Sequence, residues 1–396
     1  MSSLKKILIV CERNSHRAPR LYNEYLVLKN DFDILIAGDF KPNYIDESRF
    51  IDININPIIL KNKKKSNSGI NFIHNQFLKL KFLFSFGFVK PRDIPFLYDL
   101  KYYYLNSKLK ALTFDILIYH HISSLPFMVY FSKKSKSKLI VNLHEYYPKE
   151  FNDQNNWSRK EYYLNSLCAR FLKEATLLFC VNKSISEEYA HNFDIDKSNI
   201  LVFYNVKNYE DTKPSIVDEN NIKLVHHGAA IPSRNLDKMI DLVNLLPRNY
   251  SLTLILVPSN REYFKRLKRM KTDKVIFEKP VSSEKISKML NQYDIGLYLL
   301  SPSNFNESNA LPNKYFEFIQ ANLCLAVSPI DEMKEITEKN NFGVVSNSFD
   351  VNEMANCINA LSVNDIESYK INVHEKSKLF SLENFNSSIL DRVLKL

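Results

Sequence analysis

The sequence alternates short, continuous apolar runs with stretches of helical periodicity as far as residue 346. The runs are rich in Ile, Leu and Val throughout, which is typical of strands covered on both faces of a sheet. They are KKILIVC (5–11), FDILIAG (32–38), FDILIYH (114–120), KLIVNLH (138–144), TLLFCVN (176–182), IKLVHHG (222–228), LTLILVP (252–258), KVIFEK (274–279), DIGLYLL (294–300), CLAVS (324–328) and FGVVS (342–346). Strands that alternate with helices predict the α/β class with doubly wound, Rossmann-like parallel sheets.

The runs fall into two series, which predicts two domains. One hydrophobic core rarely serves more than about 250–300 residues, and the chain has 396. The series are separated by a polar stretch with no apolar period, KNYEDTKPSIVDENN. We therefore expect an N-terminal Rossmann-like domain over 1–206, a linker over 207–221 and a C-terminal Rossmann-like domain over 222–380. Residues 381–396 have helical spacing and are expected to form a C-terminal helix that can cross back to the first domain.

Glycine and cysteine usage excludes several kinds of site. The six glycines are too far apart for a dinucleotide-binding fingerprint or a P-loop, so side chains and helix N-termini must hold any bound phosphate. The five cysteines are scattered without a C-x-x-C pair, which argues against a disulfide framework and a zinc site. No metal is expected. The apolar part of MSSLKKILIVCERN is too short for a signal peptide, so a cytoplasmic location is expected.

Positive charge is concentrated in the first half. Residues 1–210 contain 31 Lys and Arg against 21 Asp and Glu, which accounts for the whole net charge of +10. Within 60–110, eleven cations and two anions are mixed with Phe, Leu and Tyr. This composition favours an interfacial segment on an anionic membrane surface, with a core helix that has a solvated Lys face as the alternative. Nucleic acid is not expected as a partner, because no recognised nucleic-acid motif accompanies the charge.

Polar residues follow several of the predicted strands of the first series. Ligands of doubly wound sheets bind beyond the carboxyl ends of the strands, so these residues are candidates. His16 and Arg17 follow the first strand, where a helix N-terminus attracts anions, although a capped surface turn is an alternative. His120 ends the third run and can contact substrate or be a satisfied core histidine. His144 and Glu145 follow the next run and can bind an acceptor, act as a base or anchor the loop.

The second half contains a glycine and an arginine after its first strand. Gly228 permits a close approach of the backbone to a ligand. Arg234 precedes a predicted helix that begins near residue 235, where its planar guanidinium can hold a phosphate. The alternative is an ordinary surface arginine.

The stretch LPNKYFEFIQANLCLAV combines a helix start with an unusual charge. Pro312 suits the opening of a helix, which places Lys314 in the first turn, where a cation opposes the helix dipole. That placement is favourable when an anion is bound. Glu317 lies on the same face, and its carboxylate can accept two ribose hydroxyls while Lys314 neutralises phosphate. Asn322 is expected to end the helix in the left-handed conformation. The alternative is a helix with an i,i+3 ion pair.

Several of these segments are similar to motifs of one enzyme family. FDILIYHHISSLP resembles the family pattern D-v-v-H-A-H-D…L-P, and KLIVNLHEYYP resembles l-v-y-D-x-H-E-l-y-P. LPNKYFEFIQANLCLAVS resembles x-P-N-K-l-f-E-y-m-a-a-G-x-P-V-v-a-S, the strongest match. The chain thus resembles GT-B-fold glycosyltransferases, most of all glycosyltransferase family 4, nearly from end to end.

The resemblance implies roles for the candidate residues. It implies that Glu317 binds the nucleotide ribose, and that Arg234 and Lys314 bind the diphosphate beside Gly228 and Asn313. It also implies that His120 orients the transferred sugar. His16, Arg17, His144 and Glu145 are expected to bind the acceptor.

The sequence departs from the family pattern at five places. Ala229 stands where the family has the diphosphate-binding Arg, so Arg234 is expected to take over its role. The family has an acidic residue eight positions before the ribose-binding Glu, and Asn309 stands there, so Glu307 or Asn309 is expected to take over its role. Asn142 stands where the family has Asp, and His121 stands where it also has Asp. The glycine-rich turn after the first strand is replaced by Asn14-Ser15.

The resemblance implies transfer of a sugar from a nucleotide-activated donor to a saccharide or lipid-linked saccharide, in bacterial surface polysaccharide or glycan synthesis. Retention of anomeric configuration is expected, without a metal or other cofactor. A nucleotide-sugar epimerase of the same fold and a non-catalytic nucleotide-sugar-binding subunit are the alternatives. Family members that extend lipid-linked saccharides dock on the cytoplasmic leaflet. The protein is therefore expected on the inner face of the cytoplasmic membrane, held peripherally through residues 60–110.

Overall fold

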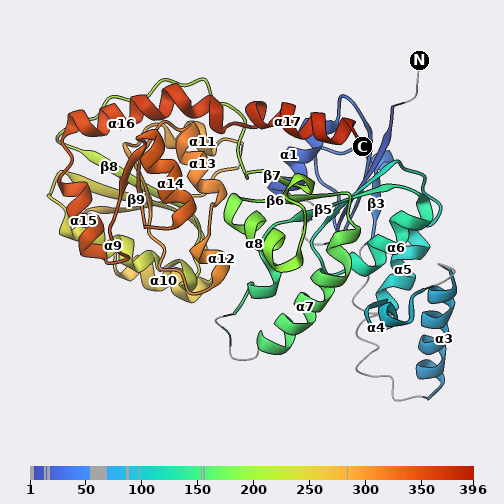
Figure 1. Cartoon of the computed structure of the whole chain (residues 1–396). Helices are drawn as coiled ribbons and strands as arrows, with labels where there is room; N and C mark the ends of the chain where they lie inside the picture. The colour runs from blue at the N-terminus through green and yellow to red at the C-terminus, as the bar shows by residue number, and fades with distance from the viewer. Residues whose placement is uncertain are drawn as a thin grey trace. The chain divides into compact units, whose positions relative to one another are not determined.

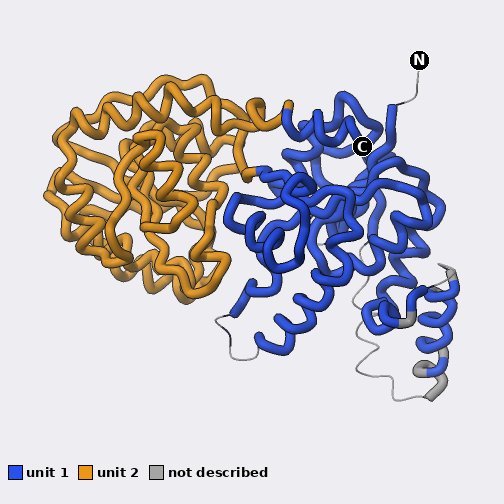
Figure 2. The backbone as a smooth tube through the Cα atoms, in the orientation of Figure 1, with its two compact units in different colours: residues 1–203, 388–396 blue, residues 204–387 orange. Residues whose placement is uncertain are grey.

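The structure is a computed structural model that describes residues 4–12, 15, 18–53, 69–85, 89–97, 99–152, 154, 157–282 and 284–396. The chain divides into two compact units, coloured separately in Figure 2. Unit 1 comprises residues 1–203 and 388–396, and unit 2 comprises residues 204–387. The end of the last helix is therefore counted with unit 1.

Unit 1 is built on a parallel sheet whose strand order in the described residues is β3-β2-β1-β4-β5-β6-β7. The strands are β1 (Lys6–Cys11), β2 (Asp33–Gly38), β3 (Phe50–Asp52), β4 (Ile116–His120), β5 (Lys138–Leu143), β6 (Leu177–Cys180) and β7 (Ile200–Val202). The helices are α1 (Pro19–Leu28), α3 (Gly69–Ser85), α4 (Ile94–Leu97), α5 (Leu100–Leu109), α6 (Leu125–Ser135), α7 (Trp157–Phe171) and α8 (Lys183–Phe193). The order reverses between β1 and β4, which places the ligand crevice of such a sheet at their carboxyl ends.

Unit 2 repeats this architecture with the strand order β10-β9-β8-β11-β12-β13 in the described residues. Two of its strands, β8 and β9, are labelled among its helices in Figure 1. The strands are β8 (Ile222–Ala229), β9 (Tyr250–Val257), β10 (Val275–Glu278), β11 (Ile295–Tyr298), β12 (Cys324–Val327) and β13 (Gly343–Val345). The helices are α9 (Leu236–Leu245), α10 (Arg261–Arg269), α11 (Ile286–Leu290), α12 (Phe305–Ser308), α13 (Asn313–Gln320), α14 (Asp331–Asn340), α15 (Val351–Asn359), α16 (Val363–Lys376) and α17 (Leu382–Leu394), the last of which ends in unit 1. Here the switch point lies between β8 and β11.

The apolar runs of the sequence form the cores of both units. In β1, Ile7, Leu8, Ile9 and Val10 are all fully buried, and β4, β5, β11 and β12 are buried along their whole length apart from the first residue of β5. Burial on both faces explains why these strands read as continuous apolar runs. The predicted α/β class with two doubly wound parallel sheets is confirmed. Every predicted strand is present, and β3 and β7, three residues each, were not predicted.

The stretch 207–221, expected to link the domains, belongs to unit 2. An isolated bridge joins Lys207 to Ser381, and Val217 is buried in the core of unit 2. The backbone of Val217 also donates to the Glu367 carboxylate of α16 at 3.2 Å. The units meet in the sequence at residues 203 and 204, three residues before the expected boundary.

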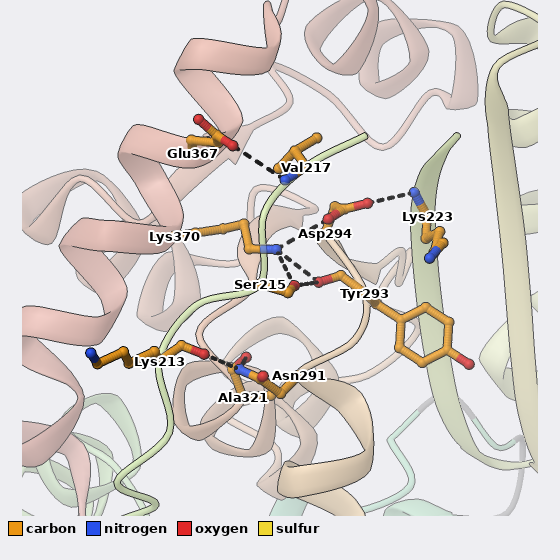
Figure 3. Close-up of polar contacts among 10 residues, drawn as sticks. All are labelled: Lys213, Ser215, Val217, Lys223, Asn291, Tyr293, Asp294, Ala321, Glu367 and Lys370. Atoms are coloured by element: carbon orange, nitrogen blue, oxygen red, sulfur yellow. Dashed lines mark hydrogen bonds and ion pairs between the residues drawn. The ribbon is translucent and has the colours of Figure 1, made fainter. Parts of the chain in front are cut away.

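A buried lysine holds this stretch to the unit (Figure 3). Lys370 of α16 is 1% exposed, and its Nζ lies 3.1 Å from Asp294 Oδ1. It also donates to Ser215 Oγ at 2.8 Å and to the Tyr293 carbonyl at 3.0 Å. The second carboxylate oxygen of Asp294 accepts from the backbone N–H of Lys223 at 2.9 Å. Burial lowers the pKa of Lys370 and Asp294 opposes that shift, so removal of either partner leaves the other buried without its counter-ion.

This pair predicts a large effect on the stability of unit 2. We expect Lys370→Met to lower the free energy of unfolding by about 3–5 kcal/mol, because Asp294 is then a buried carboxylate without a counter-ion. Urea denaturation of the full chain measures this. Lys339→Met on the exposed face of α14 is the control and should change the value by less than about 0.5 kcal/mol. Equal stability of the two variants would contradict the role given to Lys370.

Candidate functional site

A pocket of about 450 Å³ lies at the carboxyl ends of the strands of unit 2. Polar and apolar residues both line it. The residues that line it are His227, Gly228, Arg234, Ile255, Val257, Pro280, Val281, Ile286, Pro312, Asn313, Lys314 and Glu317. The predicted residues Gly228, Arg234, Asn313, Lys314 and Glu317 are thus brought together in one pocket. It occupies the position where doubly wound sheets bind ligands.

Lys314 is the most unusual group in this pocket. It lies in the first turn of α13 and its side chain is 9% exposed. Its Nζ lies 3.3 Å from His226 Nε2 and 5.4 Å from the centre of the Tyr298 ring. Within the described part of the chain, no carboxylate lies at ion-pair distance from it, so the alternative of an i,i+3 pair with Glu317 is not what forms. Burial and the nearby Arg234 lower the pKa of Lys314 to about 7, with Glu317 opposing the shift.

Two residues of β8 create the space and the polarity around Lys314. His226 donates from Nδ1 to the Leu297 carbonyl at 2.8 Å, which leaves the Nε2 lone pair facing Lys314. Burial, and next the charge of Lys314, hold the pKa of His226 well below its usual value, so the ring is neutral. Gly228 has φ +131°, and a Cβ there would lie 3.0 Å from the Nζ of Lys314. The positive φ favours glycine at this position, and a side chain there would lie close to the lysine.

Glu317 lies one helical turn further along α13 and is held by two cationic or ionisable groups. Its Oε1 lies 3.1 Å from Lys207 Nζ, and its Oε2 lies 3.2 Å from His227 Nε2. Burial alone would raise the pKa of Glu317, but His227 and Lys207 together lower it to about 2. The carboxylate is therefore ionised at neutral pH. Its two oxygens have lone pairs for further hydrogen bonds from hydroxyl groups.

Arg234 lies at the rim of the same pocket. It ends a short 3-10 turn (Pro232–Arg234), and Asn235 after it has φ 47° before α9 begins at Leu236. Its Nη1 donates to the hydroxyl of Tyr298 at 3.3 Å. Arg234 and Lys314 therefore place two cations around Tyr298.

Glu307 and Asn309 lie on and just after α12. Glu307 Oε2 accepts from the backbone and hydroxyl of Ser303, both at 2.8 Å. Asn309 donates from its side chain to the Phe305 carbonyl at 2.8 Å. Both side chains are half-buried and take part in the local folding of the loop, and neither lines the pocket described above. Their role toward a sugar stays a prediction.

Two of the candidate residues of unit 1, His120 and His144, are hydrogen-bonded to each other. His120 at the end of β4 is 2% exposed, and both of its ring nitrogens are engaged, Nε2 with Glu24 at 2.7 Å and Nδ1 with His144 at 3.0 Å. His144 is half-buried and Glu145 is exposed. His16 and Arg17 lie outside the described residues. Their predicted roles remain predictions.

Residues that the sequence analysis did not single out complete both clusters. Lys207 lies at the start of the expected linker, yet it contacts the Glu317 carboxylate through the fold. Tyr298 was part of a strand run and carries no motif of its own. Glu24 and Arg20 read as ordinary polar positions of α1, but both are buried. Long-range contacts connect these side chains, so no local signal could have identified them. Among the described residues, no group of three His, Cys, Asp or Glu is placed to hold a metal ion.

The buried Lys314 predicts a pH dependence of the free energy of unfolding. Its pKa is about 7 in the folded protein and 10.5 without burial, so the unfolded chain binds more protons between these values and stability rises with pH. Between roughly pH 7 and pH 9, the free energy of unfolding of the wild type should rise by about 2 kcal/mol more than that of the Lys314→Met variant. Urea titrations of both proteins at the two pH values measure this. A difference that does not change with pH would show that Lys314 stays charged throughout.

Comparison with known proteins agrees with this architecture. Glycosyltransferase Family 4 matches residues 80–208 of the chain. No curated protein matches the sequence significantly.

Solved structures match the chain over nearly its whole length. HepE from Anabaena, in complex with UDP, has a TM-score of 0.68 at 14% identity and covers 99% of this chain and 100% of its own. A variant of TarM from S. aureus, in complex with fondaparinux, alpha-GlcNAc-glycerol and UDP, has a TM-score of 0.66 at 13% identity, with 99% of both chains covered. WaaG, a glycosyltransferase involved in lipopolysaccharide biosynthesis, has a TM-score of 0.64 at 10% identity and covers 97% of this chain and 98% of its own. With two Rossmann-like units and a segment that matches this family, the chain has the GT-B fold and resembles glycosyltransferase family 4.

Proposed function

We propose that the protein is a glycosyltransferase that moves a sugar from a nucleotide-activated donor to a saccharide or lipid-linked saccharide acceptor. The observation that carries this proposal is the buried Lys314, which has no carboxylate at ion-pair distance in the described structure and faces the same pocket as the ionised Glu317. A site with a cation and a carboxylate one helical turn apart on α13 suits a ligand that has both an anionic group and hydroxyl groups. A nucleoside diphosphate has both. Similar proteins that bind UDP support the same ligand.

The pocket suggests how the donor is bound. The diphosphate lies against Lys314 and Arg234, and the ribose hydroxyls donate to Glu317. The apolar lining residues Ile255, Val257 and Pro280 suit contact with the face of a base. Binding an anion restores the charge of Lys314, whose pKa near 7 in the free protein reflects its burial.

Catalysis in this scheme depends on positioning and charge. As the bond between sugar and diphosphate breaks, negative charge develops on the leaving phosphate, and two fixed cations stabilise it without reorganisation. The acceptor hydroxyl loses its proton to the leaving phosphate, so no covalent intermediate on the enzyme is needed. We propose a retaining reaction that needs no metal, in bacterial surface polysaccharide or glycan synthesis.

The ribose contact yields the first test. We expect Glu317→Ala to weaken the binding of UDP by about 1.5–3 kcal/mol, the range for hydrogen bonds to a charged group. Isothermal titration calorimetry of the folded variant measures it. Glu338→Ala, which removes an exposed carboxylate of α14, is the matched control and should bind UDP like the wild type. Unchanged affinity in Glu317→Ala would exclude the ribose assignment.

We also propose that the protein binds the anionic inner face of the cytoplasmic membrane through residues 60–110. No helix of the described structure is both long and apolar enough to cross a bilayer. In α3, however, Ile73, Phe77, Leu80 and Phe84 recur at helical spacing and are 67%, 61%, 47% and 79% exposed. We call these four residues the α3 apolar face. Lys81 beside them is exposed as well, and Lys61, Lys63, Lys64 and Lys65 lie outside the described residues.

This arrangement suits insertion of apolar side chains while cations bind lipid headgroups. Each cation near an anionic surface contributes about 1 kcal/mol, and each buried Phe about 1.5–3 kcal/mol. An exposed apolar stripe on a helix is unusual for a surface that only meets water. The same stripe could cover another protein, and the dependence on lipid charge separates the two.

Vesicle binding tests this proposal. We expect co-sedimentation with phosphatidylserine-containing vesicles at low ionic strength, weakened by salt. The double change Phe77→Ser and Phe84→Ser should reduce the bound fraction severalfold. Ile216→Ser removes an exposed apolar side chain of unit 2, 89% exposed, and should leave binding unchanged. Equal binding to neutral vesicles, or none to anionic ones, would contradict the proposal.

A further inference from the structure

Unit 1 contains a series of polar side chains that are hydrogen-bonded to one another in its interior. Glu24 of α1 is fully buried, and its Oε2 lies 2.7 Å from Nε2 of His120. Nδ1 of His120 lies 3.0 Å from Nε2 of His144, which directly follows β5. Burying a carboxylate and two imidazoles is costly unless each is hydrogen-bonded, so the arrangement calls for an explanation.

Arg20, at one end of this series of hydrogen bonds, determines which group of each pair is the donor. A guanidinium can only donate, so Nε of Arg20 donates to Oδ1 of Asn142. The amide of Asn142 is thereby oriented with its Nδ2 toward Glu24, and it donates to Glu24 Oε1. Arg20 is itself held by the Phe203 carbonyl at 2.5 Å and lies 4.8 Å from the Phe203 ring centre. Glu24 thus accepts from Asn142 on one oxygen and faces His120 with the other.

Glu24 in turn determines which ring nitrogens of His120 and His144 carry hydrogen. A carboxylate only accepts, so His120 carries a hydrogen on Nε2, and a ring with that single hydrogen has a lone pair on Nδ1. Beside such a ring, His144 donates from its own Nε2. Its Nδ1 is left as a lone pair, and no described residue is hydrogen-bonded to that atom. Burial, and then His120 and Arg20, hold the pKa of His144 well below its usual value, which agrees with a neutral ring.

We propose that Glu24 and His120 are positioning residues that fix His144 with an unprotonated Nδ1, ready to accept a hydrogen bond from a saccharide hydroxyl. The identity of that hydroxyl rests on the proposed transferase function, whereas the fixed tautomer does not. His144 is half-buried, while His120 is shielded and has both nitrogens engaged. His144, not His120, is therefore the imidazole of this cluster that contacts the sugar.

The network also gives a reason for a departure from the family pattern. Asn142 stands where the resemblance expects Asp, so the negative charge next to Arg20 is supplied by Glu24 on α1 instead. An amide at 142 and a carboxylate at 24 are complementary, and exchanging them should preserve the direction of hydrogen bonding.

Histidine tautomers measured by 15N NMR of the full chain, with 15N-labelled histidine, test this proposal. Signals are assigned with His120→Gln and His144→Gln. In the wild type at neutral pH, we expect the hydrogen on Nε2 of both rings and a pyridine-type signal for both Nδ1 atoms. A hydrogen on Nδ1 of either ring, including a doubly protonated His120, would overturn the proposal.

Two variants test the cause. In Glu24→Gln, Asn142 still donates to the oxygen of the introduced amide, so the NH2 group of that amide donates to Nε2 of His120. The hydrogens of both imidazoles should then move to Nδ1. In the double variant Glu24→Gln with Asn142→Asp, the carboxylate introduced on β5 accepts from Arg20 and from the NH2 group of the amide introduced on α1. The oxygen of that amide then accepts from His120 again, and we expect the wild-type tautomers to return.

The outcomes separate this proposal from the transferase function. A single variant with wild-type tautomers, or a double variant without rescue, would contradict the positioning role. If the single variant does not fold, the double variant and the wild type still decide, because both must show hydrogen on Nε2. No donor or acceptor is present in these measurements, so failure of the transferase proposal would leave their result unchanged.

Discussion

The site in unit 2 depends on one unfavourable placement: a lysine buried in the first turn of a helix. The helix dipole, burial and Arg234 all disfavour its charged form. The fold tolerates it because Gly228 leaves room for Nζ and the neutral His226 offers a lone pair. Such a group contributes little to stability, and in the proposed function an anionic ligand compensates its charge. Glu317, held ionised by Lys207 and His227, adds the acceptor for hydroxyls in the same pocket.

Much of the fold could be predicted from the sequence, because strands buried on both faces leave continuous apolar runs. The strands β3 and β7, which have three residues each, were not predicted. Lys314 could be identified from the conflict between its charge and the helix start, and Asn322 has the positive φ expected of it, 57°. The sequence could not identify Lys207, Tyr298 or Glu24 as site residues, because their contacts are with residues far away in the sequence. The polar stretch 207–221 read as a linker because the partner that holds it, Lys370, lies over 150 residues away (Figure 3).

Buried charged groups have different surroundings in this protein. In unit 2, Lys370 is matched by Asp294 and two oxygen acceptors, and this pair serves the structure. Among the described residues, Lys314 has no carboxylate at ion-pair distance. Glu24 is hydrogen-bonded to Asn142 and to His120, and His120 contacts the half-buried His144. Groups whose burial is fully compensated hold the fold together. Lys314 and His144 have a charge or a lone pair without a partner among the described residues, and these are the groups for which we propose a ligand contact.

The claim that Lys314 and Arg234 await a diphosphate is tested most directly by comparing nucleoside diphosphates with their nucleosides. Calorimetry of the wild-type chain with UDP, GDP and CDP, and with uridine, guanosine and cytidine, provides this comparison. The account predicts that at least one diphosphate binds and that its nucleoside binds at least about 100-fold more weakly, because hydrogen bonds to two cations are lost. Equal binding of a diphosphate and its nucleoside, or no binding of any diphosphate, would contradict it.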